Sequence, residues 1–139
     1  MSDSPFMMVC GAGATQIVKI LLESEPKEGV QDLLKHNPLT GKTPLFVASA
    51  NGHAGIVSLL LGNADDDMVN RPTHDGVTPL YVASANRHTE VVALLLAHTG
   101  IDVNQKTNEG RSPLCVASGN GDAEVVALLL SHPNINVNA

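Results

Sequence analysis

The sequence predicts an all-α repeat solenoid, in which stacked helix–turn–helix pairs are joined by β-hairpin-like loops. Two observations carry this prediction. A segment of nineteen residues, TPLFVASANGHAGIVSLLL at positions 43–61, recurs as TPLYVASANRHTEVVALLL at 78–96 and as SPLCVASGNGDAEVVALLL at 112–130. The prolines that head the copies, Pro44, Pro79 and Pro113, follow one another at 35 and 34 residues, a spacing typical of repeat architectures.

A fourth, divergent copy opens the chain with SPFMMVCGAGATQIVKILL. The offset of 39 residues that aligns Pro5 with Pro44 also aligns Ile17 with Ile56. This offset exceeds the next period by four residues, which fall in the segment 28–38. Apolar residues keep helical spacing there, so we expect an extra helical turn. The four repeats then span about residues 1–36, 37–71, 72–105 and 106–139.

The elements of one repeat follow from its capping and breaking residues. Each copy begins with Ser or Thr followed by proline, which predicts a hydroxyl N-cap and a proline at the first helical position. In the second copy the first helix covers about 44–51 and the second about 54–61. Gly52, Arg87 and Gly121 occupy the break between the helices, where we expect a left-handed residue. The turns THDG and TNEG between the pairs indicate hairpins.

Length, charge and cysteine usage narrow the choice of function. We expect one domain over residues 1–139. The formal net charge is −6 with Lys and Arg scattered singly, which argues against nucleic acid and against an anionic membrane surface as partners. The apolar run 6–14 is too short and too interrupted to predict a secretion signal or a membrane span. Cys10 and Cys115 match no zinc or redox spacing, and a free, reduced pair indicates an intracellular protein, cytoplasmic or nuclear.

Helix, turn, helix and hairpin in this order resemble the ankyrin repeat family over essentially the whole chain. The residues that carry the resemblance are GKTPL at 41–45, GVTPL at 76–80 and GRSPL at 110–114, together with Ala48, Ala83, Ala117 and Gly52–His53. The sequence departs from the family where Phe46, Tyr81 and Cys115 replace the usual histidine. The last repeat also lacks a polar outer helix, so a C-terminal cap is missing and self-association through that end stays open.

The resemblance implies a non-catalytic scaffold that binds another protein across the hairpin tips and the inner face of the first helices. Carried onto this sequence, the tips are Leu39, Thr40 and Lys42; His74, Asp75 and Val77; Asn108, Glu109 and Arg111. The helix face adds Phe46, Tyr81 and Cys115, and the asparagines Asn51, Asn86 and Asn120. Two structural alternatives stay open: the asparagines cap the first helices, and Phe46 tucks under its hairpin. The alternative function is a regulatory or targeting module of a longer, enzymatic protein, because ankyrin arrays are often fused to catalytic domains.

Three motifs suggest other chemistry but fit a repeat better. Gly11 and Gly13 lack the third glycine of a dinucleotide-binding turn. His53 and His88 recur at equivalent places, and in the ankyrin family such a histidine bonds the neighbouring hairpin backbone. The acidic run 65–67 lacks the ligand spacing of a calcium loop and predicts a solvated loop, with an interaction loop as the alternative. We therefore expect no catalytic residue, no cofactor and no metal site.

Overall fold

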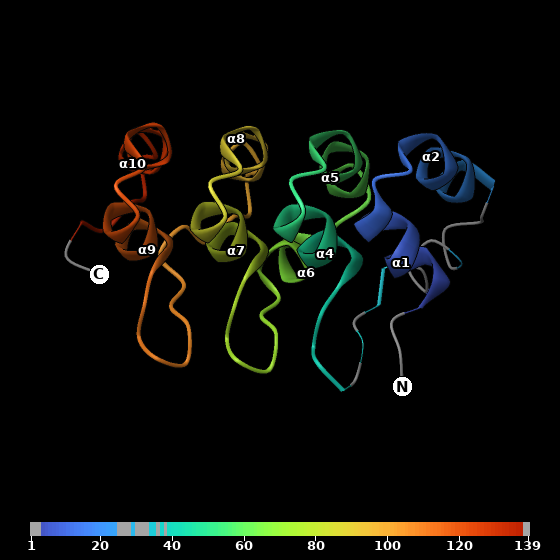
Figure 1. Cartoon of the computed structure of the whole chain (residues 1–139), viewed down its shortest axis with the longest axis horizontal. Helices are drawn as coiled ribbons and strands as arrows, with labels where there is room; N and C mark the ends of the chain where they lie inside the picture. Colours follow the sequence, from blue (N-terminus) through green and yellow to red (C-terminus); the bar gives the residue numbers. More distant parts are fainter. Residues whose placement is uncertain (1–3, 25–28, 30–33, 36, 38, 138–139) are drawn as a thin grey trace.

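The computed structural model describes residues 4–24, 29, 34, 35, 37 and 39–137. In this part of the chain the α-helices stand in pairs along one axis (Figure 1). The first helices of the pairs are α1 (Pro5–Ala12), α4 (Pro44–Ala50), α7 (Pro79–Ala85) and α9 (Pro113–Gly119). The second helices are α2 (Thr15–Ser24), α5 (Ala54–Leu61), α8 (Thr89–Leu96) and α10 (Ala123–Leu130). No strand occurs among these residues, which confirms the predicted all-α solenoid.

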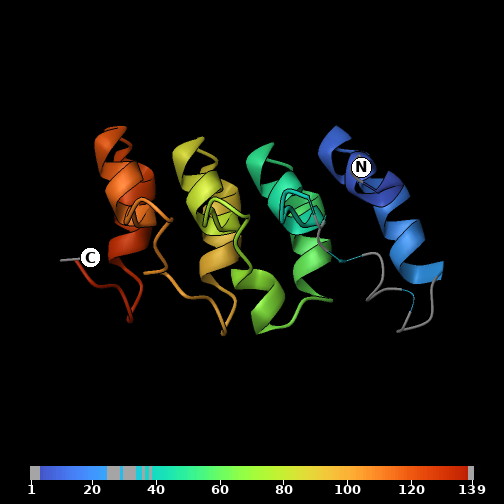
Figure 2. The same cartoon turned by 90° about the horizontal axis from the view of Figure 1, so that it is seen from below.

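The helix pairs form two layers. First helices make one layer and second helices the other (Figure 1), and the view from below shows the pairs following one another along the array (Figure 2). Helix α1 packs against α4, α4 against α7, and α7 against α9. The second helices pack in the same order, from α2 through α5 and α8 to α10. Each pair therefore shares its core with its neighbours in sequence, as a solenoid requires.

Each first helix begins at a hydroxyl cap followed by proline. The capping side chains accept hydrogen bonds from the backbone N–H three residues on: Ser4 from Met7 at 3.1 Å, Thr43 from Phe46 at 3.0 Å, Thr78 from Tyr81 at 3.1 Å and Ser112 from Cys115 at 3.1 Å. The caps satisfy backbone donors that have no partner within the helix. The predicted start of the first helix is thus confirmed in all four copies.

A left-handed residue ends each first helix, as predicted. Gly52 has φ 75°, Gly121 has φ 68° and Arg87 has φ 62°. Gly13 does the same for α1 with φ 78°, and the Gly11–Gly13 segment is therefore a helix terminus. Arg87 is the one described non-glycine residue with positive φ. An L-residue with a Cβ pays for this conformation with about 1–2 kcal/mol of steric energy.

The second and third helix pairs each bury one apolar face against the preceding pair and another against the following pair, whereas the first and fourth pairs have one such neighbour among the described residues. Ile56 and Val91 are 0% and 1% exposed, whereas Ile17, the equivalent residue of the first pair, is 51% exposed. No described helix pair covers Ile17 from that side. On the opposite face Val92 is fully buried, and its equivalent Val126 in the fourth pair is only half-buried. Burial therefore depends on the neighbouring repeat as much as on residue type.

The loops between the pairs fold back on themselves and bond to one another. Within the loops, the N–H groups of Asn37, Thr73 and Thr107 donate to the carbonyls of Lys42 (2.7 Å), Val77 (3.0 Å) and Arg111 (2.8 Å). Between the loops, His74 N–H donates to Thr40 O at 3.0 Å, and Asn108 N–H donates to Asp75 O at 3.2 Å. The hairpin-like loops project beside the first helices (Figure 1), and these bonds fix the spacing of the loops along the array.

The acidic segment after α5 is a short helix, so the predicted solvated loop is wrong in its secondary structure. Helix α6 (Asp66–Asn70) starts at Asp65, whose carboxylate accepts a hydrogen bond from Met68 N–H at 2.9 Å. Acidic residues in a first helical turn are favoured by the positive end of the helix dipole. The three aspartates are exposed, as expected. Most of the segment 28–38, in which an extra helical turn is predicted, lies outside the described residues.

Candidate binding surface

The two equivalent histidines connect neighbouring repeats, but not through the hairpin. His53 Nε2 lies 2.9 Å from Gly11 O, and His88 Nε2 lies 3.0 Å from Ala50 O. Both acceptors are carbonyls near the end of the first helix of the preceding repeat. Because a carbonyl only accepts, Nε2 carries the proton in each ring. The expected bond to the hairpin backbone is therefore wrong, and the histidines cover orphaned helix-end carbonyls instead.

The asparagines predicted on the helix face also bond to helix ends. Asn51 Nδ2 donates to Val47 O of its own helix at 3.0 Å. Asn86 Nδ2 donates to Ala50 O, and Asn120 Nδ2 donates to Ala85 O, both at 2.9 Å and both in the preceding repeat. All three asparagines stand at the C-caps of their first helices, as the capping alternative predicts, and the side chains of Asn86 and Asn120 in addition link repeats. In the fourth repeat Asp122 replaces the histidine and caps α10 through Val125 N–H at 3.3 Å.

The third position of each first helix becomes more exposed along the array, from Met7 through Phe46 and Tyr81 to Cys115. Met7 is 1% exposed and Phe46 is 8% exposed. Tyr81 is half-buried, and Cys115 is exposed. Phe46 offers a partner little of its surface, in agreement with the alternative in which it is tucked away. Tyr81 is therefore the more exposed of the two aromatic side chains at this position.

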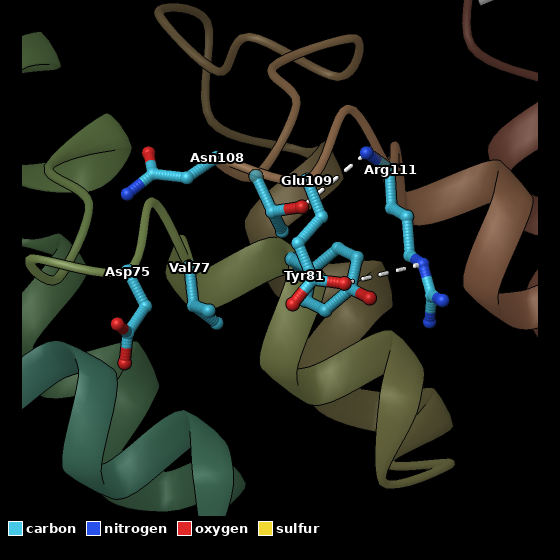
Figure 3. Close-up of a pocket in the computed structure, with 7 residues that line it drawn as sticks. Asp75, Val77, Tyr81, Asn108, Glu109 and Arg111 are labelled. Carbon is cyan, nitrogen blue, oxygen red and sulfur yellow. Dashed lines mark hydrogen bonds and ion pairs between the residues drawn. The ribbon is translucent and has the colours of Figure 1, made fainter.

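A cavity of about 420 Å³ opens over Tyr81, between two neighbouring hairpins. It is lined by Asp75, Val77, Tyr81, Thr107, Asn108, Glu109 and Arg111. Helix α7 positions the tyrosine, and the two hairpins position the other side chains (Figure 3). Six of these residues belong to the predicted binding set, and Thr107 was missed. Thr107 could have been found as the residue before the Asn-Glu-Gly turn, at the foot of the hairpin.

The remaining predicted residues do not line this cavity. Leu39 and Thr40 are exposed at the preceding hairpin, next to half-buried Lys42. His74 lines a second cavity of about 530 Å³ with Asp67, Asn70, Arg71, Pro72, Thr73 and Gln105. Asn51, Asn86, Asn120 and Cys115 line neither cavity. The structure therefore groups six of the candidate residues at the second and third hairpins, whose loops span residues 73–77 and 107–111, and at Tyr81 between them.

Sequence reasoning also missed a recurring asparagine clasp between the loops. Asn70 Nδ2 donates to Gly100 O at 2.7 Å, and Asn70 Oδ1 accepts from Asp102 N–H at 2.8 Å. Asn104 makes the same two bonds with Asn134 O and Asn136 N–H, both at 2.8 Å. The signal was present as a Val-Asn step repeated in two copies. These bonds tie each of these loops to the equivalent loop of the next repeat.

The cavity offers the aromatic ring of Tyr81, the carboxylates of Asp75 and Glu109, and the guanidinium of Arg111. Arg111 Nε lies 3.9 Å from Glu109 Oε2, with both side chains largely exposed. No group of three or more His, Cys, Asp or Glu that could hold a metal ion occurs in the described part of the chain. Outside the cavity, burial raises the pKa of the Cys10 thiol to about 12, so this cysteine is protonated at neutral pH.

Comparison with known proteins agrees with this architecture. No described helix has the length and apolar character needed to cross a membrane. No curated protein matches the sequence. A family model described as ankyrin repeats (3 copies) matches residues 1–71 and again residues 62–139. Ankyrin repeats are generally protein–protein interaction modules. Because the two matches together cover the whole length, the chain belongs to the ankyrin repeat family.

Proposed function

We propose that this chain is a non-catalytic scaffold that binds another protein across its hairpin tips and the exposed face of its first helices. The observation that supports the proposal is the cavity over Tyr81, which gathers six of the predicted binding residues from two hairpins and one helix. Protein interfaces favour tyrosine and arginine as energetic centres. Tyr81 and Arg111 both line this cavity, and hydrogen bonds between the hairpins hold the hairpins beside one another.

The binding role is tested by removing the aromatic ring. Tyr81→Ala, combined with Asp75→Ala, is expected to weaken a captured protein partner by about 2 kcal/mol or more, which corresponds to about thirtyfold in Kd. Calorimetric titration of the partner into the wild type and the variant measures the difference. Glu90→Ala, on the exposed side of α8, is the matched control and should bind like the wild type. Unchanged affinity in a folded Tyr81→Ala, Asp75→Ala variant would place the site elsewhere.

The alternative function is that the same surface serves as a regulatory or targeting module within a longer, enzymatic protein. The chain would then supply recognition while another domain supplies the chemistry. Adding the chain to a truncated parent enzyme and measuring turnover separates the two proposals. Turnover that depends on Tyr81 supports the alternative, and turnover that is the same with and without the chain contradicts it.

A second proposal concerns the outer side of the fourth repeat. Leu130 is 48% exposed and Val137 is 61% exposed, and both lie at the same end of the array. Apolar surface of this kind tends to find a partner. We infer that copies of the chain associate through this end at high concentration. Sedimentation velocity should show a concentration-dependent dimer that Leu130→Glu abolishes, and a wild type that stays monomeric at near-millimolar concentration would contradict the inference.

The compartment is also a proposal. Cys10 and Cys115 are both free thiols, and Cys10 is fully buried. Free thiols are typical of reducing compartments. We infer an intracellular protein, cytoplasmic or nuclear. Fluorescence microscopy of a tagged chain tests this inference, and signal confined to the secretory pathway would contradict it.

A further inference from the structure

The cavity over Tyr81 carries more negative than positive groups. Its charged residues are two carboxylates, Asp75 and Glu109, and one guanidinium, that of Arg111. The Asp75 side chain has no ion-pair partner among the described residues. Figure 3 draws Asp75 and Arg111 at opposite ends of the cavity, with Val77 and Tyr81 between them. The end of the cavity that Asp75 forms therefore carries a carboxylate that no described cation neutralises.

The ion pair at the other end leaves Glu109 available. Arg111 Nε and Glu109 Oε2 are 3.9 Å apart, at the outer limit of an ion pair, and their side chains are 61% and 78% exposed. Exposed pairs of this kind contribute little to stability because water and salt screen them. An incoming cation can therefore share the Glu109 carboxylate without breaking a strong bond.

The floor of the cavity suits a long cationic side chain. The half-buried ring of Tyr81 presents an aromatic surface, which attracts ammonium and guanidinium groups. Val77 lies beside it and offers an apolar contact for the methylene stem of a lysine or arginine. Asn108 uses its amide nitrogen on His74 O at 2.8 Å, and no described donor bonds its amide oxygen. That oxygen adds a further acceptor to the lining.

The combination of an exposed carboxylate, an apolar side chain and an accessible aromatic ring, as at Asp75, Val77 and Tyr81, is present once in the described array. In the preceding hairpin, Thr40 stands at the position of Asp75 and Lys42 at the position of Val77, so the carboxylate is replaced by a hydroxyl and a cation is added. Phe46, the equivalent of Tyr81, is buried. In the fourth repeat Cys115 replaces the ring. A site that differs between otherwise similar repeats is suited to selecting one partner.

We propose that the cavity receives a lysine or arginine side chain of the protein partner, with its stem on Val77 and Tyr81 and its charge between Asp75 and Glu109. This proposal rests on the proposed function, because it assigns chemistry to the same binding surface. It implies that the partner presents a basic residue in an extended segment, which reaches between two neighbouring hairpin tips. Charge complementarity of this kind speeds association and makes it sensitive to salt.

A peptide selection tests the proposal without knowledge of the partner. A phage-displayed library of random peptides is panned on the full chain, and the selected peptides are rebound to three variants. Tyr81→Ala removes the floor. Asp75→Asn with Glu109→Gln removes the two carboxylates of the cavity, and Glu90→Gln with Glu124→Gln removes two exposed carboxylates on the second helices as a matched change in net charge.

The expected result is a set of peptides enriched in lysine or arginine. Their affinity should fall about tenfold or more in the Asp75→Asn, Glu109→Gln variant and stay unchanged in the Glu90→Gln, Glu124→Gln control. Peptides that depend on Tyr81 but carry no basic residue would overturn this inference and leave the proposed function standing. Peptides enriched in acidic residues would overturn it in favour of Arg111 as the anchor. Peptides that ignore Tyr81 altogether would overturn both proposals.

Discussion

The third and fourth repeats present the same residue types to their C-terminal sides. The equivalent pairs are Leu80 and Leu114, Ser84 and Ser118, and Val92 and Val126. Leu80 is 1% exposed and Ser84 and Val92 are fully buried, because α9 and α10 lie against them. In the fourth repeat the leucine and valine are half-buried and the serine is exposed. Identical residues therefore contribute differently according to the neighbour that covers them.

This difference shows where the stability of the array resides. In a solenoid each repeat gains from its own helices and from the interfaces with its neighbours. The third repeat has two described interfaces and the fourth has one. The following changes test whether the covered interface, more than the repeat itself, sets the behaviour of each residue.

The two thiols should differ in reactivity by several orders of magnitude. Cys10 is 0% exposed, and burial raises its pKa from 9.0 to about 12, whereas Cys115 is exposed in the fourth repeat. Since the thiolate is the reactive form, Cys10 should be inert at pH 8. A chromogenic disulfide reagent should modify one thiol per native chain and two in urea. The native signal should vanish in Cys115→Ser. Rapid modification of that variant would mean that the interface between α1 and α4, where Cys10 is buried, opens readily.

Substitution of the two equivalent leucines compares the stability contributed by a covered side chain, Leu80, with that of a less covered one, Leu114. Leu80→Ala should lower the free energy of unfolding by about 2–5 kcal/mol, because it removes fully buried methyl groups and leaves a cavity. Leu114→Ala should lower it by about 1 kcal/mol, because its side chain is only half-buried. Urea denaturation followed by circular dichroism gives both values. Equal losses would show that the fourth repeat is sealed by something other than a following helix pair.

Hydrogen exchange should rank the repeats by their interfaces. Amides of α9 and α10 should exchange about tenfold faster than those of α7 and α8, because the last pair is held from one side. Fusing a helix pair with a polar outer face after Ala139 should slow exchange in α9 and α10 and leave α7 and α8 unchanged. If the two pairs exchange alike in the unmodified chain, the comparison between the repeats fails.

Much of the fold could be predicted because it depends on local chemistry. The hydroxyl caps at Thr43, Thr78 and Ser112 need only a side-chain oxygen that accepts the N–H three residues on, and the left-handed break at Gly52 needs only a residue without a Cβ. Such rules act within a few residues. They can therefore be read from the sequence before the repeats are placed beside one another.

The binding surface could be predicted only in part, because it depends on distances between repeats. The bond from His88 to Ala50 requires the offset between two first helices, which the repeated sequence does not contain. Phe46 and Tyr81 share one position in the repeat, yet their burial differs with the chain around them. The sequence places the predicted tip residues in loops of equivalent repeats, while the cavity lined by both Asp75 and Arg111 depends on how two of these loops lie beside one another.

The smallest expected effect concerns the break in the third repeat, which also connects it to the fourth. Arg87 holds φ 62° and its Nη2 donates to Asn120 O at 2.9 Å. Arg87→Gly relieves about 1 kcal/mol of backbone strain but loses this exposed bond, so its net effect on stability should lie within about 0.5 kcal/mol of zero.

Two further variants separate the two contributions. Arg87→Ala keeps the strain and loses the bond, so it should be less stable than Arg87→Gly by about 1 kcal/mol. Gly121→Ala adds the same strain in the fourth repeat, where a Cβ meets no atom within 4 Å, and should cost a similar amount. Urea denaturation compares all three. If Arg87→Gly instead destabilises as much as Arg87→Ala, the side chain of Arg87 holds the fourth repeat in place, and the weakness of that repeat is partly compensated from the third.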